Sequence, residues 1–163
     1  MGSSQANVMT SQKSEGYESP RLAEVSAMNI VVVDDIVSWR QFISTMLQKE
    51  QSFAVVGEVS GVEAVETARK LRPAIVVLEI NLRDSGGLAI GEQILDILPD
   101  TKLIYLSSEF DHDIVRIAFR LGAFAYVLKS DAVGDLVSAI HAAARNETFV
   151  STQLQGHGFL DTI

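Results

Sequence analysis

The chain has 163 residues, of which 47% are hydrophobic and 21% charged, so it is long and apolar enough for one globular domain and is not a disordered chain. It contains no cysteine, which excludes disulfides, thiolate metal sites and cysteine nucleophiles and is typical of a reducing compartment. The formal net charge of -8 argues against nucleic acid as a direct partner. Because the sequence has no membrane-spanning apolar run and no signal-peptide pattern, we expect a cytoplasmic protein without membrane contact.

Residues 1–27 are polar and lack apolar periodicity, which predicts a flexible N-terminal arm. From Asn29 onward, short apolar runs alternate with segments whose apolar residues recur at helical spacing. The apolar runs predict strands at 30–33, 53–59, 75–79, 103–106 and 125–128. The helical spacing predicts helices at 39–47, 62–71, 88–98, 114–121 and 133–143, with Pro73 and Pro99 ending the second and third and Gly122 capping the fourth.

Short strands that are buried on both faces and joined by crossover helices require a parallel sheet with helices on both sides. We therefore predict an α/β fold, a flavodoxin-like doubly wound sheet of five strands in the order 2-1-3-4-5. The folded domain is predicted at 28–147. Residues 148–163 contain few apolar side chains and are predicted to form a C-terminal tail, either a short extra helix or the start of a linker.

Polar residues follow four of the predicted strands at the point where each ends. They are Asp34 and Asp35, Glu79, Ser107 and Lys129. Because a parallel sheet brings the carboxyl ends of its strands to one edge, where such sheets bind ligands, we expect these side chains to lie together. Three carboxylates packed together repel one another, and Mg²⁺ resolves this because it prefers oxygen ligands. A hydroxyl and an ammonium are suitable donors to phosphoryl oxygens, so the pattern predicts a Mg²⁺-dependent phosphoryl site.

Each of these residues also has a plainer interpretation. The acidic pair can cap the first helix, Ser107 can cap the fourth, and Tyr126 can be an ordinary core aromatic. Glu109 is interpreted as a solvated loop acid. The three histidines have no ligand-like spacing and are interpreted as surface or partly packed residues: His112, His141 and His157.

Four motifs stand in order at the expected strand ends: Val33-Asp34-Asp35, the third-strand exit at Glu79, Leu106-Ser107, and Tyr126-Val127-Leu128-Lys129. On these motifs, residues 29–151 resemble the CheY-like receiver domain of two-component response regulators. Three further phrases resemble the subclass that carries a LuxR-type helix-turn-helix: Val55-Val56-Gly57-Glu58, Leu71-Arg72-Pro73 and Gly122-Ala123-Phe124-Ala125-Tyr126.

The resemblance implies a phosphorelay signalling module rather than an enzyme, in a transcriptional regulator whose DNA-binding domain is missing here. It implies that Asp34, Asp35, the third-strand acid and the backbone carbonyl of Asn81 hold Mg²⁺. A histidine kinase or phosphotransfer protein would donate the phosphoryl group, which Ser107 and Lys129 would bind while Tyr126 reorients as the switch. A homodimer is the further expected partner.

One position departs from the family, because the phosphoacceptor is Asp there and Glu79 here. The extra methylene adds about 1.5 Å of reach, and misplacing a reacting atom by about 1 Å can cost a hundredfold in rate. We therefore expect Glu79 to accept phosphoryl poorly or not at all. Alternatively, its carboxylate reaches Ser107 or Lys129 and imitates the phosphorylated state, with about one negative charge where a phosphoryl group adds nearly two.

Other functions on the same fold stay open. A Mg²⁺-dependent phosphohydrolase would need an Asp nucleophile with a general acid, and no such pair is evident. A flavodoxin-type cofactor protein would need a Gly-rich phosphate-binding turn after the first strand, where this chain has an acidic pair. The remaining alternative is a pseudo-receiver, a protein-interaction module that needs neither phosphorylation nor metal.

Overall fold

The structure is a computed structural model that describes residues 1–4 and 26–155. Most of the predicted N-terminal arm, the end of the predicted tail and His157 lie outside these residues.

The centre of the molecule is a parallel sheet in the order β2-β1-β3-β4-β5-β6. The predicted order of the first five strands is therefore confirmed. Its strands are β1 (Met28–Val33), β2 (Phe53–Val59), β3 (Ile75–Leu78), β4 (Lys102–Ser107), β5 (Ala123–Leu128) and β6 (Phe149–Val150).

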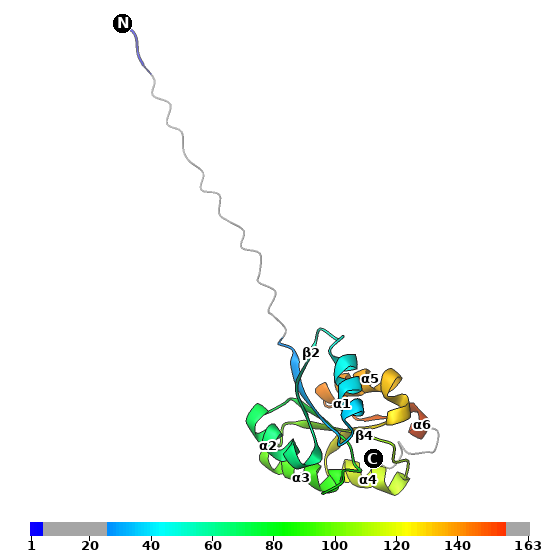
Figure 1. Ribbon diagram of the computed structural model, residues 1–163. Coiled ribbons are helices and arrows are strands. Elements are labelled where there is room, and N and C mark those ends of the chain that lie inside the picture. Colours follow the sequence, from blue (N-terminus) through cyan, green and yellow to red (C-terminus); the bar gives the residue numbers. More distant parts are fainter. Residues whose placement is uncertain (5–25, 156–163) are drawn as a thin grey trace.

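Helices cover both faces of this sheet (Figure 1). They are α1 (Val37–Leu47), α2 (Gly61–Leu71), α3 (Gly87–Ile97), α4 (His112–Arg120), α5 (Ala132–Ala144) and the short α6 (Thr152–Gln155), with a single 3₁₀ turn at Lys129–Asp131. Buried residues of α1 and α5 pack on one face, and those of α2, α3, α4 and α6 pack on the other.

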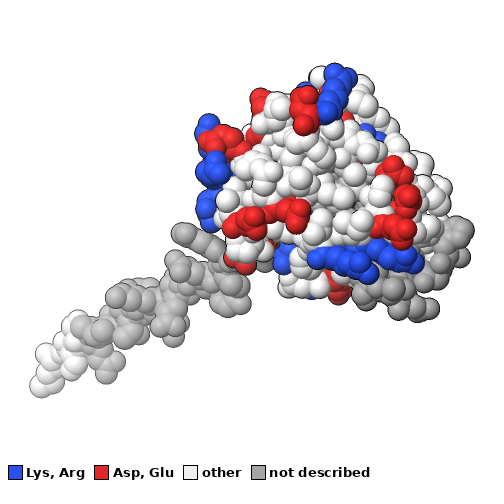
Figure 2. Space-filling view, turned by 90° about the horizontal axis from the view of Figure 1, so that it is seen from below, with Lys and Arg blue, Asp and Glu red and all other residues white. Residues whose placement is uncertain are grey.

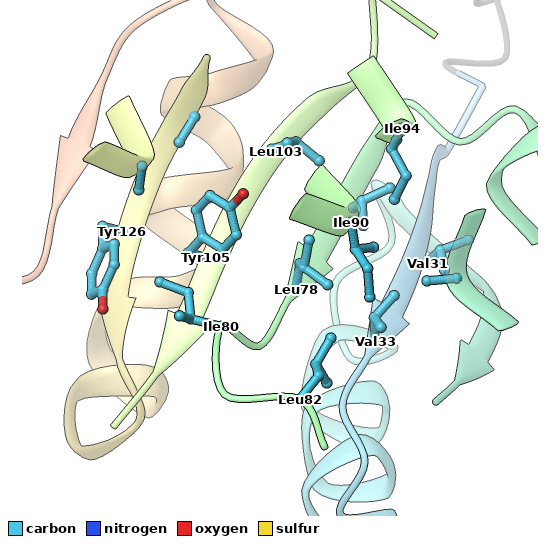
Figure 3. Packing of buried hydrophobic residues seen from close by; sticks show 14 of the residues in the cluster. Val31, Val33, Leu78, Ile80, Leu82, Ile90, Ile94, Leu103, Tyr105 and Tyr126 are labelled. Atoms are coloured by element: carbon cyan, nitrogen blue, oxygen red, sulfur yellow. The ribbon is translucent and has the colours of Figure 1, made fainter. Parts of the chain in front are cut away.

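The strands bury both faces because their side chains alternate between two core clusters. Along β1, Val31 and Val33 belong to the cluster under α2, α3 and α4, whereas Ile30 and Val32 belong to the cluster under α1 and α5. Figure 3 shows the first of these clusters, with Leu78 at its centre. This two-sided burial is why the strands are continuous apolar runs and why a charge at a strand end stands out.

Local signals in the sequence explain where helices begin and end. Ser60 and Glu63 form a reciprocal capping box at the start of α2. Gly122 follows α4 with a φ of 100°, which glycine adopts without the steric cost that a Cβ brings, so its predicted capping position is confirmed.

The sixth strand is an addition to the predicted sheet. Val150 and Leu154, which follow the predicted domain, are buried in the core cluster that also contains Tyr126. A strand of two residues is too short to produce an alternating pattern, so the sequence gives no periodic signal for it.

Candidate functional site

The site is centred on the ammonium group of Lys129, which lies between two carboxylates at the carboxyl edge of the sheet. Its Nζ is 2.6 Å from Oδ2 of Asp34 and 2.7 Å from Oε2 of Glu79. Asp34, Glu79 and Lys129 are only 5%, 6% and 8% exposed. Desolvation opposes the charge on Lys129, but the hydrogen bonds that its ammonium donates to the two carboxylates outweigh desolvation and raise the pKa of this lysine. The structure therefore brings together residues that follow β1, β3 and β5.

The other oxygen of Glu79 faces hydrogen-bond donors from two further segments. The hydroxyl of Ser107 donates to Oε1 at 2.6 Å, and the backbone N–H of Asn81 donates to the same oxygen at 2.9 Å. Both oxygens of the Glu79 carboxylate are therefore engaged. Asn81, which the resemblance implied as a carbonyl ligand, contributes its N–H to the site here.

Asp34 and Asp35 are neighbours in sequence but differ in what they bind. Asp35 accepts backbone hydrogen bonds from Gly61 at 2.9 Å and from Arg83 at 2.7 Å, one on each oxygen. Burial alone would raise the pKa of Asp35, but these two bonds outweigh burial and hold it below its usual value. Asp35 thus ties the end of β1 to the start of α2 and to the loop after β3.

The predicted Mg²⁺ site is all oxygen in chemistry, which suits a hard dication. Yet the part of the chain that the structure describes has no group of three His, Cys, Asp or Glu side chains that could hold a metal ion. The reason is visible in the contacts, because Lys129 lies between Asp34 and Glu79 and backbone N–H groups occupy Asp35. In this arrangement the residues do not form a metal centre, and Mg²⁺ binding stays a prediction.

Trp39 is a further member of the site. The Lys129 ammonium lies 4.9 Å from the centre of the Trp39 ring, within cation–π range. Phe42, one turn further along α1, meets Trp39 edge-on at 5.7 Å. The sequence places Trp39 one helical turn after the acidic pair, but nothing in its spacing indicates contact with a lysine 90 residues away.

A chain of hydrogen bonds links the Glu79 carboxylate to the buried Tyr126. Ser107 donates to Glu79 and accepts from the backbone N–H of Glu109 at 3.1 Å, and the Tyr126 hydroxyl donates to the carbonyl of Glu109 at 2.9 Å. Tyr126 is fully buried, and burial is the main cause that raises the pKa of its hydroxyl. Figure 3 shows this hydroxyl directed toward the carboxyl edge of the sheet, while that of Tyr105 points toward α3. Because the link runs through the backbone of Glu109, the identity of that residue could not reveal it.

The remaining polar residues of the prediction lie apart from this cluster. His141 packs against Phe53 with ring centres 5.0 Å apart, and His112 begins α4. A cavity of about 490 Å³ lies at the opposite edge of the sheet, beside Asn29, Pro73 and Thr101. None of the predicted site residues line this cavity.

The surface adds two observations. On the face seen in Figure 2, Lys and Arg side chains lie in separate groups with Asp and Glu beside them, rather than in one basic stripe. Among the helices of residues 1–4 and 26–155, none has both the length and the apolar character needed to cross a membrane.

Residues 30–141 match the response regulator receiver domain family. The transcriptional regulatory protein LiaR of Bacillus subtilis (strain 168) is 28% identical over 130 residues, which cover 79% of this chain and 62% of LiaR. The response regulator protein VraR of Staphylococcus saprophyticus is 30% identical over 128 residues, which cover 78% of this chain and 61% of VraR. The chain thus spans about three-fifths of the length of these curated relatives.

Solved structures agree. A two-component response regulator of the LuxR family from Aurantimonas sp. SI85-9A1 superposes with a TM-score of 0.76 at 26% identity, covering 80% of this chain and 94% of that one. The response regulator domain of Thermotoga maritima CheB has the same fold, with a TM-score of 0.68 at 24% identity, covering 73% and 97%. Because the family match covers more than half of the sequence and the motif residues lie at one edge of a CheY-like sheet, the chain belongs to the response regulator receiver domain family and is close to its LuxR-type regulators.

Proposed function

We propose that this chain is the receiver module of a two-component transcriptional regulator in which the Glu79 carboxylate stands where a phosphoryl group would bind. In this proposal the module holds a signalling arrangement without phosphoryl transfer. The observation that carries it is the double contact of Glu79, which accepts from the Ser107 hydroxyl and pairs with the Lys129 ammonium at the same time. These two residues are the ones that the family resemblance assigns to phosphoryl binding.

The position of Tyr126 supports the imitating role. A phosphoryl group recruits the Ser or Thr of β4 in the mechanism that the resemblance implies, and the aromatic residue of β5 then reorients. Here Ser107 is already bonded to the acidic residue, and Tyr126 is buried with its hydroxyl on the loop that follows Ser107. The Glu79 side chain therefore makes the contact with Ser107 that would otherwise depend on a phosphoryl group supplied by a partner protein.

The same contacts oppose phosphoryl transfer to Glu79. A carboxylate oxygen that attacks phosphorus needs a free lone pair in line with the leaving group, and even small displacements are costly in rate. One Glu79 oxygen accepts two hydrogen bonds and the other pairs with an ammonium. The resemblance implies a histidine kinase or phosphotransfer protein as partner, but the active arrangement then does not require one. Homodimerisation is the expected consequence of the active arrangement.

A second candidate is a pseudo-receiver that acts as an interaction module without metal. The observation that favours it is the ion pair itself, because the Lys129 ammonium pairs with both Asp34 and Glu79 in the place where a dication would act. The two candidates differ in whether removing the Glu79 charge changes the surface around β5 and α4.

The test is intact mass spectrometry after incubation with acetyl phosphate and Mg²⁺, with Glu79→Asp as the matched variant. We expect no phosphoryl adduct on the wild-type chain and an adduct on Glu79→Asp, because Asp restores the family's side-chain length. An adduct that maps to Glu79 in the wild-type chain would refute the proposal. Amide NMR shifts of Tyr126 and of α4 in Glu79→Gln then separate the candidates, since only the imitating role predicts that these shifts change.

A further inference from the structure

Residues 149–155 form a short segment that we call the C-terminal strap. The strap contains β6 and α6 and lies along the free edge of β5. Val150 pairs with Tyr126 in parallel register, and the backbone N–H of Ser151 donates to the carbonyl of Tyr126 at 2.9 Å. The last described part of the chain is therefore attached to the strand that carries the predicted switch residue.

Ser151 makes the contact that matters most. Its side chain is fully buried, and its hydroxyl oxygen accepts the backbone N–H of Leu128 at 3.0 Å. Leu128 lies beyond the last residue that β6 pairs, so the serine hydroxyl takes the place of a neighbouring strand. Without it, a buried N–H at the end of β5 would lose its hydrogen bond, which is costly in a protein interior.

The hydroxyl proton of Ser151 is directed at the acidic side chains that follow β5. Oδ2 of Asp131 lies 2.8 Å away and Oδ2 of Asp135 lies 3.3 Å away. Thr152 and Gln153 add backbone and side-chain bonds to the same two carboxylates. Gln153 of the strap and Lys129 both line a small cavity of about 140 Å³.

Ser151 bonds to two residues of β5, Leu128 and Tyr126, and each of them is connected to the site. Leu128 directly precedes Lys129, whose ammonium pairs with Glu79, and Tyr126 bonds to the loop that follows Ser107. Val150 and Leu154 bury their side chains in the cluster that also contains Tyr126 and the α4 residues Val115 and Ala118.

From these contacts we propose that Ser151 is a positioning residue for Lys129 and Tyr126, and that the strap and the site are coupled through the end of β5. When the pairing at Glu79 changes, the end of β5 shifts and the strap loosens; when the strap detaches, Lys129 loses part of its support. The coupling is reciprocal, as any equilibrium coupling between two sites must be. This inference does not rest on the phosphoryl-imitating role of Glu79, because it requires only that the site contacts be altered.

Amide hydrogen exchange followed by NMR tests the coupling from both ends. In the Ser151→Ala chain we expect the Leu128 amide to exchange about tenfold faster and the Lys129 ammonium protons to exchange several-fold faster, in line with coupling factors of about 5 to 150. The matched control is Thr152→Val, which removes only the exposed hydroxyl bond to Asp135 and leaves β5 untouched. We expect it to leave both exchange rates unchanged.

The reverse arm uses Glu79→Ala, which we expect to speed exchange of the Ser151 amide several-fold. Ser60→Ala, at the start of α2, serves as the remote control and should leave that amide unchanged. The proposal would be overturned if Ser151→Ala left the exchange of the Lys129 ammonium unchanged and Glu79→Ala left the exchange of the Ser151 amide unchanged. If Ser151→Ala fails to fold, the Glu79→Ala arm alone decides it. An adduct on wild-type Glu79 in the mass-spectrometric test would leave this coupling intact, so the two proposals fail separately.

Discussion

At the scale of single residues, the site depends on what surrounds the Lys129 ammonium. Two carboxylates and one aromatic ring lie around it, and each comes from a different segment of the chain. A buried ion pair is costly to form unless its geometry is good and its remaining bonds are satisfied. Here Ser107 and the Asn81 N–H satisfy the far oxygen of Glu79, and Trp39 covers the ammonium.

We expect Trp39→Leu to lower the free energy of unfolding by about 0.5–2 kcal/mol, because the cation–π contact with Lys129 is lost. Trp39→Phe should retain part of it, because it keeps an aromatic ring. A double-mutant cycle with Lys129→Met, measured by denaturant unfolding, separates this contact from general packing. Phe42→Leu is the control, since Phe42 contacts Trp39 edge-on whereas the Lys129 ammonium lies over the Trp39 ring. A coupling no larger for Trp39 than for Phe42 would contradict the assigned contact.

A second residue-scale feature is the hydroxyl of Tyr105. It is buried and has no hydrogen-bond partner among the described residues, and it lies where a Cβ at Gly91 of α3 would have to fit. We expect Gly91→Ala to destabilise the domain by about 1–3 kcal/mol, because overpacking forces side chains or backbone to move. Tyr105→Phe should be close to neutral, since it removes an unsatisfied polar group.

The double variant provides the sharper measurement. With the hydroxyl gone, part of the overlap at position 91 disappears, so the cost of Gly91→Ala should be smaller in the Tyr105→Phe background. Thermal unfolding of the four chains gives the comparison. Equal costs in both backgrounds would show that the hydroxyl is not the obstructing group.

At the scale of elements, the strap adds a pH dependence of its own. Burial would raise the pKa of Asp131, but hydrogen bonds from Ser151 and Gln153 outweigh burial and hold this pKa below its ordinary value of 3.8. A lowered folded-state pKa means that the stabilisation is fully present above 3.8 and is lost as the pH falls through the lower folded value. Asp135 on α5 also accepts hydrogen bonds from the strap, from the hydroxyl of Ser151 and the backbone N–H of Thr152.

We therefore expect the amide shift of Gln153, which donates to Asp131, to stay constant down to the ordinary Asp value and to change only below it. Asp131→Asn should remove this acid transition and loosen the strap at neutral pH, and Asp135→Asn is the companion variant that reports the neighbouring carboxylate. NMR titration measures both. A wild-type midpoint at or above 3.8 would contradict the lowered pKa.

Elements were the level at which the sequence was most informative. Continuous apolar runs such as 75–78 predicted buried parallel strands, and the charged or hydroxyl residue after each run predicted which edge carries the site. The contact of Glu79 with Ser107 and Lys129 was among the expected alternatives. The directions of Asp34 and Asp35 were not predictable, because these residues follow the same strand yet face a lysine and two backbone N–H groups. β6 was not predicted, because a strand of two residues is too short to show a periodic pattern. The link from Ser107 to Tyr126 was not predicted either, because it runs through the backbone of Glu109.

At the scale of the whole molecule, the ion pair at Lys129 links the site to the stability of the fold. A ligand that binds only the folded state raises the stability by RT ln(1 + [L]/Kd), which is about 2.7 kcal/mol at a hundredfold excess over Kd. In this chain Mg²⁺ must compete with Lys129 for Asp34 and Glu79. Removing the ammonium leaves two buried carboxylates close together and uncompensated, which destabilises the fold but favours a dication.

We therefore expect Mg²⁺ to raise the melting temperature of Lys129→Met more than that of the wild-type chain, although the variant starts from a lower value without metal. Lys102→Met is the matched control, because Lys102 lies at the start of β4, beside Phe124 and at the opposite edge of the sheet. Its response to Mg²⁺ should equal that of the wild type. If Mg²⁺ stabilises wild type and Lys129→Met equally, then the dication and the ammonium do not share the carboxylates, and the competition inferred from the contacts of Lys129 is wrong.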